Sequence, residues 1–170
     1  MENKVINTIK NRTSTRSYSA KKVSLKKLEL ILEAGKMAPS GMNRQICNIL
    51  AIHNGRYVNS LVEASKKVRG KDCYYGAKTI ILVYGPKDDP FVTQDASCIL
   101  ENMFVAAEAL KIASCWINQS EEILSDPRNK KLRAKLGIGE DKVIVGSCIL
   151  GYSEAPKSIK ERKADFIRII

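Results

Sequence analysis

Hydrophobic residues recur along this chain with two different periods, and each change of period marks an expected element. Apolar residues three and four positions apart are typical of a helix with one buried face, whereas short continuous apolar runs are typical of buried strands. We therefore expect a short helix that ends at Arg12 and further helices over 24–38, 56–68, 93–111 and 126–136. Strands are expected over 47–53, 79–84 and 142–150, and residues 113–117 form another short apolar run.

Several residues define these elements more closely. Ser24 can cap the second helix, and Pro39 disfavours helical backbone at the residue before it, so that helix should end there. The strand 79–84 (TIILVY) is apolar throughout, and we expect both of its faces to be buried. Core-facing spacing is found in the second helix at Leu25, Leu28, Ile31 and Leu32, and in the longest helix at Ile99, Met103, Ala106 and Leu110. The mixture of elements predicts an α+β sandwich in which helices cover a sheet.

The length and composition are typical of one globular domain. Of 170 residues, 44% are hydrophobic and 28% are charged, so a single domain over 1–170 with a packed core is expected. No apolar run approaches the roughly 20 residues of a membrane-spanning helix. The first residues lack the apolar stretch of a signal peptide, so we expect a cytoplasmic protein with no membrane association. Residues 165–170 end in the apolar sequence FIRII, which should pack on its own sheet or cross to a partner chain.

Cysteine and histidine residues offer little for metal binding or nucleophilic catalysis. The five cysteines have no CxxC spacing, which argues against a disulfide framework and favours buried thiols. His53 is the only histidine and ends an apolar run, so we interpret it as structural. The usual zinc sites and Ser–His or Cys–His pairs are hard to build from this set, and no metal is expected.

The positive charge makes a polyanion a candidate partner. Lys and Arg number 29 against 18 Asp and Glu, which gives a net charge of +11. The basic pairs are spread along the chain, at Lys21-Lys22, Lys26-Lys27, Lys66-Lys67 and Lys130-Lys131. Aromatic residues make up only 6% and are not interleaved with these pairs, as a stacking platform for nucleic acid would require. Solvated helix faces and a site for one phosphorylated cofactor are the favoured explanation, and a basic nucleic-acid-binding module is the distant alternative.

Three separated segments have the residue types of a site for an anionic, planar ligand. Residues 12–16 (RTSTR) place two guanidinium groups and several hydroxyls together, a set that can hold a phosphate. In residues 38–45 (APSGMNRQ), Gly41 allows the backbone to approach a flat ring, and Asn43 offers a donor and an acceptor to a uracil-like edge. Residues 160–163 (KERK) add cations from the other end of the chain. Each segment alone is equally typical of a helix end, a loop or a basic tail.

Taken in order along the chain, these segments resemble the sequence pattern of the nitroreductase family. Residues 12–18 (Arg-x-Ser-x-Arg-x-aromatic) and 38–45 (Ala-Pro-Ser-Gly-x-Asn-x-Gln) are similar to its amino-terminal motifs. Residues 95–110 and 114–117 (SCWI) resemble its central helix and the strand that follows. Residues 150–152 (LGY), leading to 160–162 (KER), resemble its carboxy-terminal end. The resemblance runs from about Ile6 to Arg162.

The resemblance implies a mainly antiparallel central sheet flanked by helices, in an intertwined homodimer with FMN at the subunit interface. The implied contacts to the phosphate, the ribityl chain and the pyrimidine edge are Arg12, Ser14, Arg16 and the backbone of Thr13, with Lys160 and Arg162 completing the phosphate site. Residues implied to line the ring from the other subunit are Pro39, Ser40, Gly41 and Asn43. Residues implied to lie along the ring, with a backbone N–H towards N5, are Cys115, Trp116, Ile117 and Asn118.

The implied activity is hydride transfer. NADH or NADPH would deliver hydride to flavin N5 and leave, and a small planar acceptor such as a nitroaromatic compound or a quinone would then bind, which is a ping-pong mechanism. No catalytic side chain is implied, because the flavin carries the chemistry. Gln119 follows the strand where many members have glycine and could narrow the pocket, and Tyr74 and Tyr75 are candidate pocket residues, with core packing as their alternative. A flavin store or sensor, dehalogenation, azoline oxidation and flavin fragmentation are alternative activities.

Overall fold

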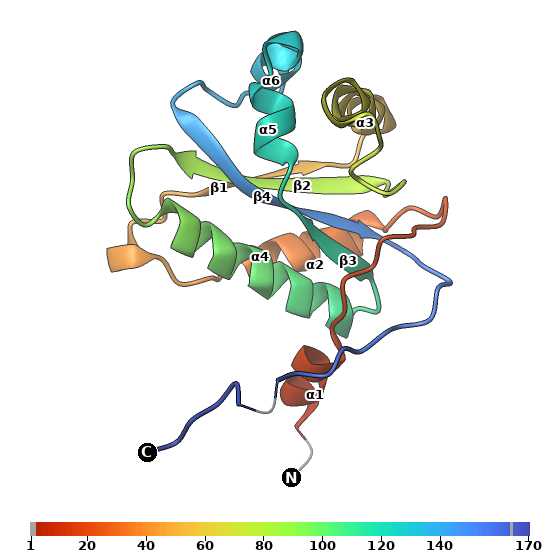
Figure 1. Ribbon diagram of the computed structural model, residues 1–170, viewed down its shortest axis with the longest axis vertical. Helices are drawn as coiled ribbons and strands as arrows, with labels where there is room; N and C mark the ends of the chain where they lie inside the picture. Colours follow the sequence, from red (N-terminus) through yellow and green to blue (C-terminus); the bar gives the residue numbers. More distant parts are fainter. Residues whose placement is uncertain (1–2, 164) are drawn as a thin grey trace.

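A four-stranded antiparallel sheet forms the middle of three layers in the computed structural model, which describes residues 3–163 and 165–170 (Figure 1). The strands are β1 (Asn48–Ile52), β2 (Thr79–Pro86), β3 (Ala113–Ile117) and β4 (Lys142–Gly151), in the order β1-β2-β4-β3. Every neighbouring pair is antiparallel. Ile80 and Leu82 of β2 point into one hydrophobic cluster, and Ile81 and Val83 point into the other. The expected burial of this strand on both faces is therefore confirmed.

Helices cover both faces of the sheet. One face carries α3 (Gly55–Arg69), α5 (Ser120–Ser125), the 3₁₀ turn η2 (Pro127–Asn129) and α6 (Lys130–Lys135) (Figure 1). The other face carries α2 (Leu25–Lys36) and α4 (Val92–Ala109), with α1 (Lys4–Asn11) against α4 and the 3₁₀ turn η1 (Gly41–Asn43) at the end of this layer. The predicted α+β sandwich is confirmed.

Two elements differ from the sequence-based expectation. The basic helix expected over 126–136 is interrupted, because the Asp126 side chain caps the turn η2 and α6 begins only at Lys130. The helix α5 was not expected at all. It has six residues and only two apolar side chains, Ile123 and Leu124, which are too few to produce a recognisable helical period.

The predicted core-facing sides of two helices are found, but some of their residues are less buried than expected. Leu25 is 62% exposed at the first position of α2, although Leu28 and Ile31 are buried as expected. Of the four residues expected to face the core from α4, only Met103 is fully buried. The deepest positions of α4 are instead Ala96, Leu100, Met103, Phe104 and Ala107. Ile99, Ala106 and Leu110 are partly buried and pack against the same core cluster, so the predicted face does face the core. The buried stripe is wider than predicted, because α4 packs on α2 as well as on the sheet.

The two ends of the chain leave large apolar side chains exposed. These are Val5, Ile6 and Ile9 of α1 and Phe166, Ile167, Ile169 and Ile170 of the tail. The tail runs away from the layers and the sheet contains no tail residue (Figure 1). Of the two alternatives for the tail, packing on its own sheet is therefore wrong, and crossing to a partner chain stays a prediction. Within residues 3–163 and 165–170, no helix combines the length and apolar character needed to cross a membrane.

A buried ion pair joins α5, α6 and β4. The Arg133 guanidinium is buried and donates to Glu121 Oε2 at 3.2 Å, to Ser125 Oγ at 2.9 Å and to the Lys142 carbonyl at 2.6 Å. The same Glu121 oxygen accepts the Ile144 backbone N–H at 2.8 Å. Burial raises the pKa of Glu121. The hydrogen bonds that Glu121 accepts from the Ser125 hydroxyl, from the Ile144 N–H and from Arg133, together with the charge of Arg133, outweigh it, so the pKa is lowered.

Glu121→Ala is expected to lower the free energy of unfolding by about 2–3 kcal/mol, because it leaves the buried Arg133 charge without its carboxylate. Urea unfolding would measure this loss. The matched control is Glu122→Ala, which removes a solvent-exposed pair with Arg69 and should cost less than about 1 kcal/mol. Equal losses in the two variants would contradict the assignment.

The stability of the wild type should also depend on Glu121 ionisation. Since the folded pKa is lowered, this stabilisation is present above the unfolded pKa of about 4.3 and is lost as the pH falls through the folded value. A Glu121→Gln variant should lack that part of the acid dependence when unfolding is followed from pH 6 to pH 3. A pH profile unchanged by the substitution would show that Glu121 does not contribute it.

Candidate functional site

The basic segment 12–16 lies along the outer edge of β3. Arg12 ends α1 in an extended conformation, and the chain continues so that Ser14 forms a parallel bridge with Ser114. The Thr15 N–H donates to the Ser114 carbonyl at 2.9 Å. The segment therefore behaves as a short additional edge strand, and Ser14 and Arg16 remain exposed beside β3.

Tyr18 fixes the end of this segment. Its hydroxyl donates to the Thr15 carbonyl at 2.8 Å, and its ring packs on Gly151, where an added Cβ would lie 2.7 Å from the ring. Burial raises the pKa of Tyr18 far above its ordinary value, so the phenol stays protonated as a donor. The Ser19 N–H then donates to the Tyr152 carbonyl at 2.8 Å. The aromatic residue of the first motif thus positions the arginines and does not itself face the groove.

Segment 12–16 and the carboxy-terminal segment line one groove of about 1120 Å³. The cations that line it are Lys10, Arg12, Arg16, Lys157, Lys160 and Arg162, against the single carboxylate of Glu101. Arg12 Nε lies 3.7 Å from Glu101 Oε1, a loose pair in which Glu101 is 57% exposed. Lys157 forms an ion pair with Glu108 of α4, which brings the chain after β4 back over α4. Two of the three predicted segments are therefore brought together, from opposite ends of the chain.

The backbone of β3 faces this segment, whereas its side chains pack inside the protein. Cys115 and Ile117 are buried, and the Trp116 ring packs on Gly146 and lies 6.2 Å from the Phe104 ring. Because backbone groups alternate along a strand and the Ser114 carbonyl points to the outer edge, Trp116 directs its N–H and C=O to the same edge. Burial raises the pKa of the Cys115 thiol, against the opposite effect of Arg16, so a thiolate nucleophile is not favoured.

The loop 38–45 has an unusual and well-anchored backbone. Met42, Asn43 and Gln45 have φ values of 52°, 55° and 51°, in the left-handed region. The Gly41 N–H donates to Asp95 Oδ1 at 2.9 Å, and the Gln45 N–H donates to Ser40 Oγ at 3.0 Å. A Cβ on Gly41 would lie 2.9 Å from the Phe91 ring, so glycine is required here by packing within the chain. The Asn43 side chain is exposed.

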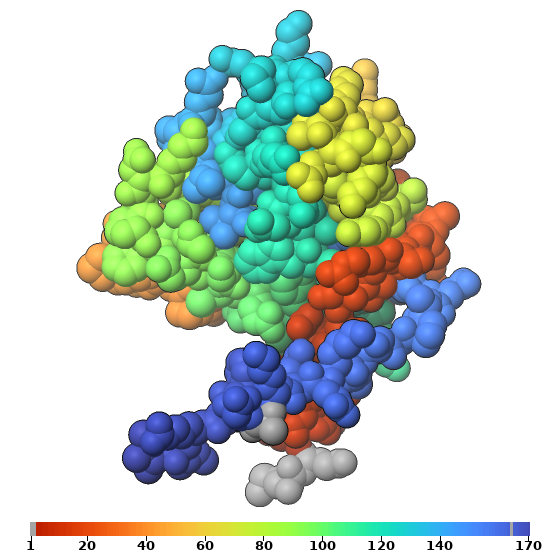
Figure 2. All heavy atoms as spheres, viewed as in Figure 1, coloured from red at the N-terminus to blue at the C-terminus, as the bar shows by residue number. Residues whose placement is uncertain are grey.

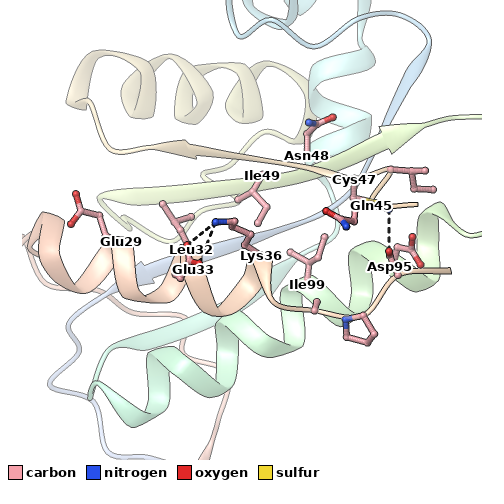
Figure 3. A pocket seen from close by; sticks show the side chains of 14 residues that line it. Glu29, Leu32, Glu33, Lys36, Gln45, Cys47, Asn48, Ile49, Asp95 and Ile99 are labelled. Carbon is pink, nitrogen blue, oxygen red and sulfur yellow. Dashed lines mark hydrogen bonds and ion pairs between the residues drawn. The ribbon is translucent and has the colours of Figure 1, made fainter. Parts of the chain in front are cut away.

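This loop lies in a different cavity from the basic groove. Pro39 and Ser40 line a pocket of about 520 Å³ between α2, α4 and the start of β1 (Figure 3). Acidic groups surround it, namely Glu29, Glu33 and the buried Asp95, and its lysine, Lys36, is paired with Glu33 at 3.2 Å (Figure 3). No residue lines both cavities. Within one chain, the second predicted segment is therefore not brought to the first and third.

The weaker pocket predictions have mixed outcomes. Tyr74 is fully buried and its hydroxyl lies 3.3 Å from Ser120 Oγ, so the prediction that it lines a substrate pocket is wrong and core packing holds. Tyr75 is 38% exposed at a φ of 53°, and Gln119 is partly buried immediately before α5. Their roles stay predictions. His53 contacts Thr79 Oγ1 at 2.8 Å between β1 and β2, away from the groove.

Sequence reasoning missed three contributors to these sites. Lys10 and Lys157 line the groove, yet each is one of many lysines and has no motif around it. Asp95 was noted as part of the central helix, but its contact with Gly41 spans 54 positions and is visible only in the fold. The available signal was a carboxylate in the first turn of α4, directly before the buried Ala96.

The chain is similar over nearly its whole length to known proteins of one family. A crystal structure of a nitroreductase with bound FMN from Bacteroides fragilis NCTC 9343 is 34% identical, covers 99% of this chain and 100% of its own, and has a TM-score of 0.93. An FMN-bound nitroreductase from Desulfitobacterium hafniense, at 24% identity, has the same fold over 100% of both chains, with a TM-score of 0.89. A protein of Archaeoglobus fulgidus, provisionally named as an NADH dehydrogenase/NAD(P)H nitroreductase, is 30% identical over 157 residues, which is 90% of this chain and 87% of that protein. The model of the nitroreductase family matches residues 9–152, and this chain belongs to that family.

Proposed function

We propose that this protein is an FMN-dependent oxidoreductase that takes hydride from NADH or NADPH and passes it to a small planar acceptor. The observation that carries the proposal is the basic groove beside the outer edge of β3, where residues from both ends of the chain meet. The B. fragilis relative, which is similar over nearly its whole length, contains FMN.

The groove fits the phosphate end of FMN. It has six cations and one carboxylate, and Arg12, Arg16 and Arg162 can each give paired N–H donors to phosphate oxygens. Ser14 and the backbone of Thr13 add neutral donors on the same strand-like segment. Lys160 adds a further positive charge from the tail side. This set favours a dianionic phosphate over a neutral ligand.

The edge of β3 suits the flat ring of the same cofactor. Bound FMN would supply a centre, N5, that accepts hydride and donates it again. The outward backbone of Trp116, and that of Asn118 beyond it, can donate a hydrogen bond at this edge without the involvement of a side chain. Arg16 is exposed beside the edge and can stabilise negative charge that develops on the pyrimidine side of the ring. The protein's part is thus to bind, orient and polarise.

A second copy of the chain would complete the site. Pro39, Ser40, Gly41 and Asn43 lie outside the basic groove, so they can contribute only from a partner subunit. The apolar residues of α1 and of the tail are exposed in one chain and would be covered in a dimer. We therefore propose a homodimer with two shared FMN sites. If only one face of the flavin ring is open, NADH or NADPH must leave this face before the acceptor can bind. Nitroaromatic compounds and quinones are flat enough to occupy the same face.

The visible spectrum, recorded without oxygen before and after addition of NADH or NADPH, tests the proposed function directly. Flavin absorption bands that bleach on addition of the nucleotide are expected. Bands that persist would favour a flavin store or sensor. A colourless protein that does not bind added FMN would contradict the proposal.

Replacement of the groove arginines should weaken FMN binding. Arg16→Ala and Arg162→Ala are each expected to raise the FMN dissociation constant about ten- to a hundredfold, because each removes a charge-assisted hydrogen bond. Fluorescence titration of the apoprotein with FMN measures the change. Arg69→Ala removes an exposed arginine on the opposite helical layer and is the matched control, for which no change is expected.

Removal of the apolar tail should disrupt the dimer. Deletion of residues 165–170, or the double substitution Phe166→Ser and Ile167→Ser, removes apolar side chains that would be buried against the partner subunit. Each variant is therefore expected to be a monomer with reduced FMN content. Light scattering and the flavin-to-protein absorbance ratio would measure both effects. A wild-type protein that is monomeric and still retains FMN would rule out the shared site.

A further inference from the structure

A second basic groove lies on the helical layer opposite to the proposed flavin site. It runs between α3 and the segment formed by η2 and α6, and has a volume of about 660 Å³. In Figure 2, α3 (yellow) and the α5–α6 region (cyan) lie side by side at one end of the molecule. None of its lining residues lines the groove at β3 or the pocket at η1. Its role is therefore separate from that of the residues described above.

The cations of this groove come from two distant parts of the sequence. Arg56 and Lys67 lie on α3, Arg128 lies on η2, and Lys131 and Lys135 lie on α6. On α3 the lining positions 56, 59, 60, 63, 64 and 67 follow the three-and-four spacing of one helix face. On α6, Lys131 and Lys135 are four positions apart and share a face in the same way. Two polar helix faces thus form the walls.

The pairing of lysines with carboxylates distinguishes this groove from an ordinary solvated surface. Lys66 pairs with Glu63 at 2.9 Å and Lys130 pairs with Glu140 at 2.7 Å. Their sequence neighbours Lys67 and Lys131 line the groove instead. Among residues 3–163 and 165–170, no carboxylate pairs with Lys67, Lys131, Arg56 or Lys135. Glu63 is the one carboxylate in the lining. Four of the five lining cations, on both walls, therefore have no ion-pair partner within the described residues.

Arg128 links the two walls of the groove through hydrogen bonds. Its guanidinium donates to both Asp126 carboxylate oxygens at 2.8 Å and 2.7 Å, and to the Lys67 carbonyl of α3 at 2.8 Å. At the floor, the buried Asn129 side chain donates to the Ile123 carbonyl at 2.8 Å and to the Ala64 carbonyl at 3.4 Å. These contacts hold α3 at a fixed distance from η2 and α6. The groove is consequently formed before any ligand binds.

The size and charge indicate the class of ligand. The volume lies in the usual range for small-ligand pockets, roughly 300–1,000 Å³. Arg56 and Lys67 are separated by about 16 Å along the axis of α3, so the cations extend along the groove and can contact more than one phosphate group. Tyr57 lies beside Arg56 in the lining and is 38% exposed, so its ring is available for stacking on a base.

We propose that the groove between α3 and α6 binds the phosphate groups of a nucleoside phosphate, with Tyr57 available to the base. The same chemistry is presented by a free nucleotide and by a short stretch of single-stranded nucleic acid. The groove accounts for part of the net charge of +11 that the flavin site does not use. The proposed binding of a nucleoside phosphate in this groove does not depend on whether FMN is bound at the other site.

The test measures binding of ADP and of a single-stranded hexanucleotide to the protein as purified, at low salt. Amide chemical shifts should change in α3 and α6, and binding should weaken as salt is raised. Lys131→Ala combined with Lys135→Ala is expected to raise the dissociation constant about tenfold or more. Lys26→Ala combined with Lys87→Ala removes the same charge from exposed positions outside the groove and should change it less than about twofold.

Tighter binding of ADP than of the hexanucleotide would identify a free nucleotide, and tighter binding of the hexanucleotide would identify a nucleic-acid strand; both outcomes support the site. Absence of binding by both probes would overturn it, as would equal weakening in the groove variant and the control. Arg56→Gln, at the other end of the groove, provides a second variant if the lysine substitutions disturb α6. FMN content and unfolding curves would separate a failure of the flavin proposal from a failure of this one.

Discussion

The pairing of β2 with β4 is the constraint on which the rest of this structure depends. The two strands are joined over eight register positions, from Thr79 opposite Leu150 to Pro86 opposite Lys142, and most of their residues are buried on both faces of the sheet. A sheet centre of this kind is stable only if helices cover both sides. The two helical layers follow from it, and with them the separation of the groove beside β3 from the α3–α6 groove on the opposite layer.

The edge strands have different roles as a result. β3 is short, and the segment 12–16 covers its outer edge only in part, through the hydrogen bond from Thr15 to Ser114. This contact lays two arginines along backbone groups that a planar ligand can use. At the other edge, β1 begins directly after the loop that Asp95 holds through Gly41. Each half of the proposed cofactor site is therefore attached to an opposite edge of one sheet, and in the proposed dimer the two halves would come from different subunits.

The distribution of charge follows the same division. Cations gather in two grooves on opposite helical layers, whereas carboxylates surround the pocket beside η1. Neighbouring lysines in the sequence have different surroundings: Lys66 and Lys130 are paired with glutamates, and Lys67 and Lys131 face a groove. Eleven of the 29 Lys and Arg residues line one of the two grooves, and a phosphate-bearing ligand would be attracted to both.

The amino-acid sequence by itself determined the elements with a strong local signal. An α+β sandwich could be predicted from elements such as the apolar run of β2 and the capped helix α2. The family could be identified from the ordered motifs between Arg12 and Arg162. The sequence did not determine α5, because six residues carry too short a period, or the burial of Tyr74, because an aromatic side chain is equally typical of a pocket and of a core.

Contacts between distant segments were decided only by the tertiary structure. The meeting of residues 12–16 with the carboxy-terminal cations depends on the path of the chain after β4, and the anchoring of Gly41 by Asp95 depends on where α4 begins. The convergence of Lys67 and Lys131 depends on the packing of η2 against α3. Local patterns describe each residue's neighbours within a few positions, whereas these sites are formed by contacts that the packing of the two helical layers on one sheet brings together.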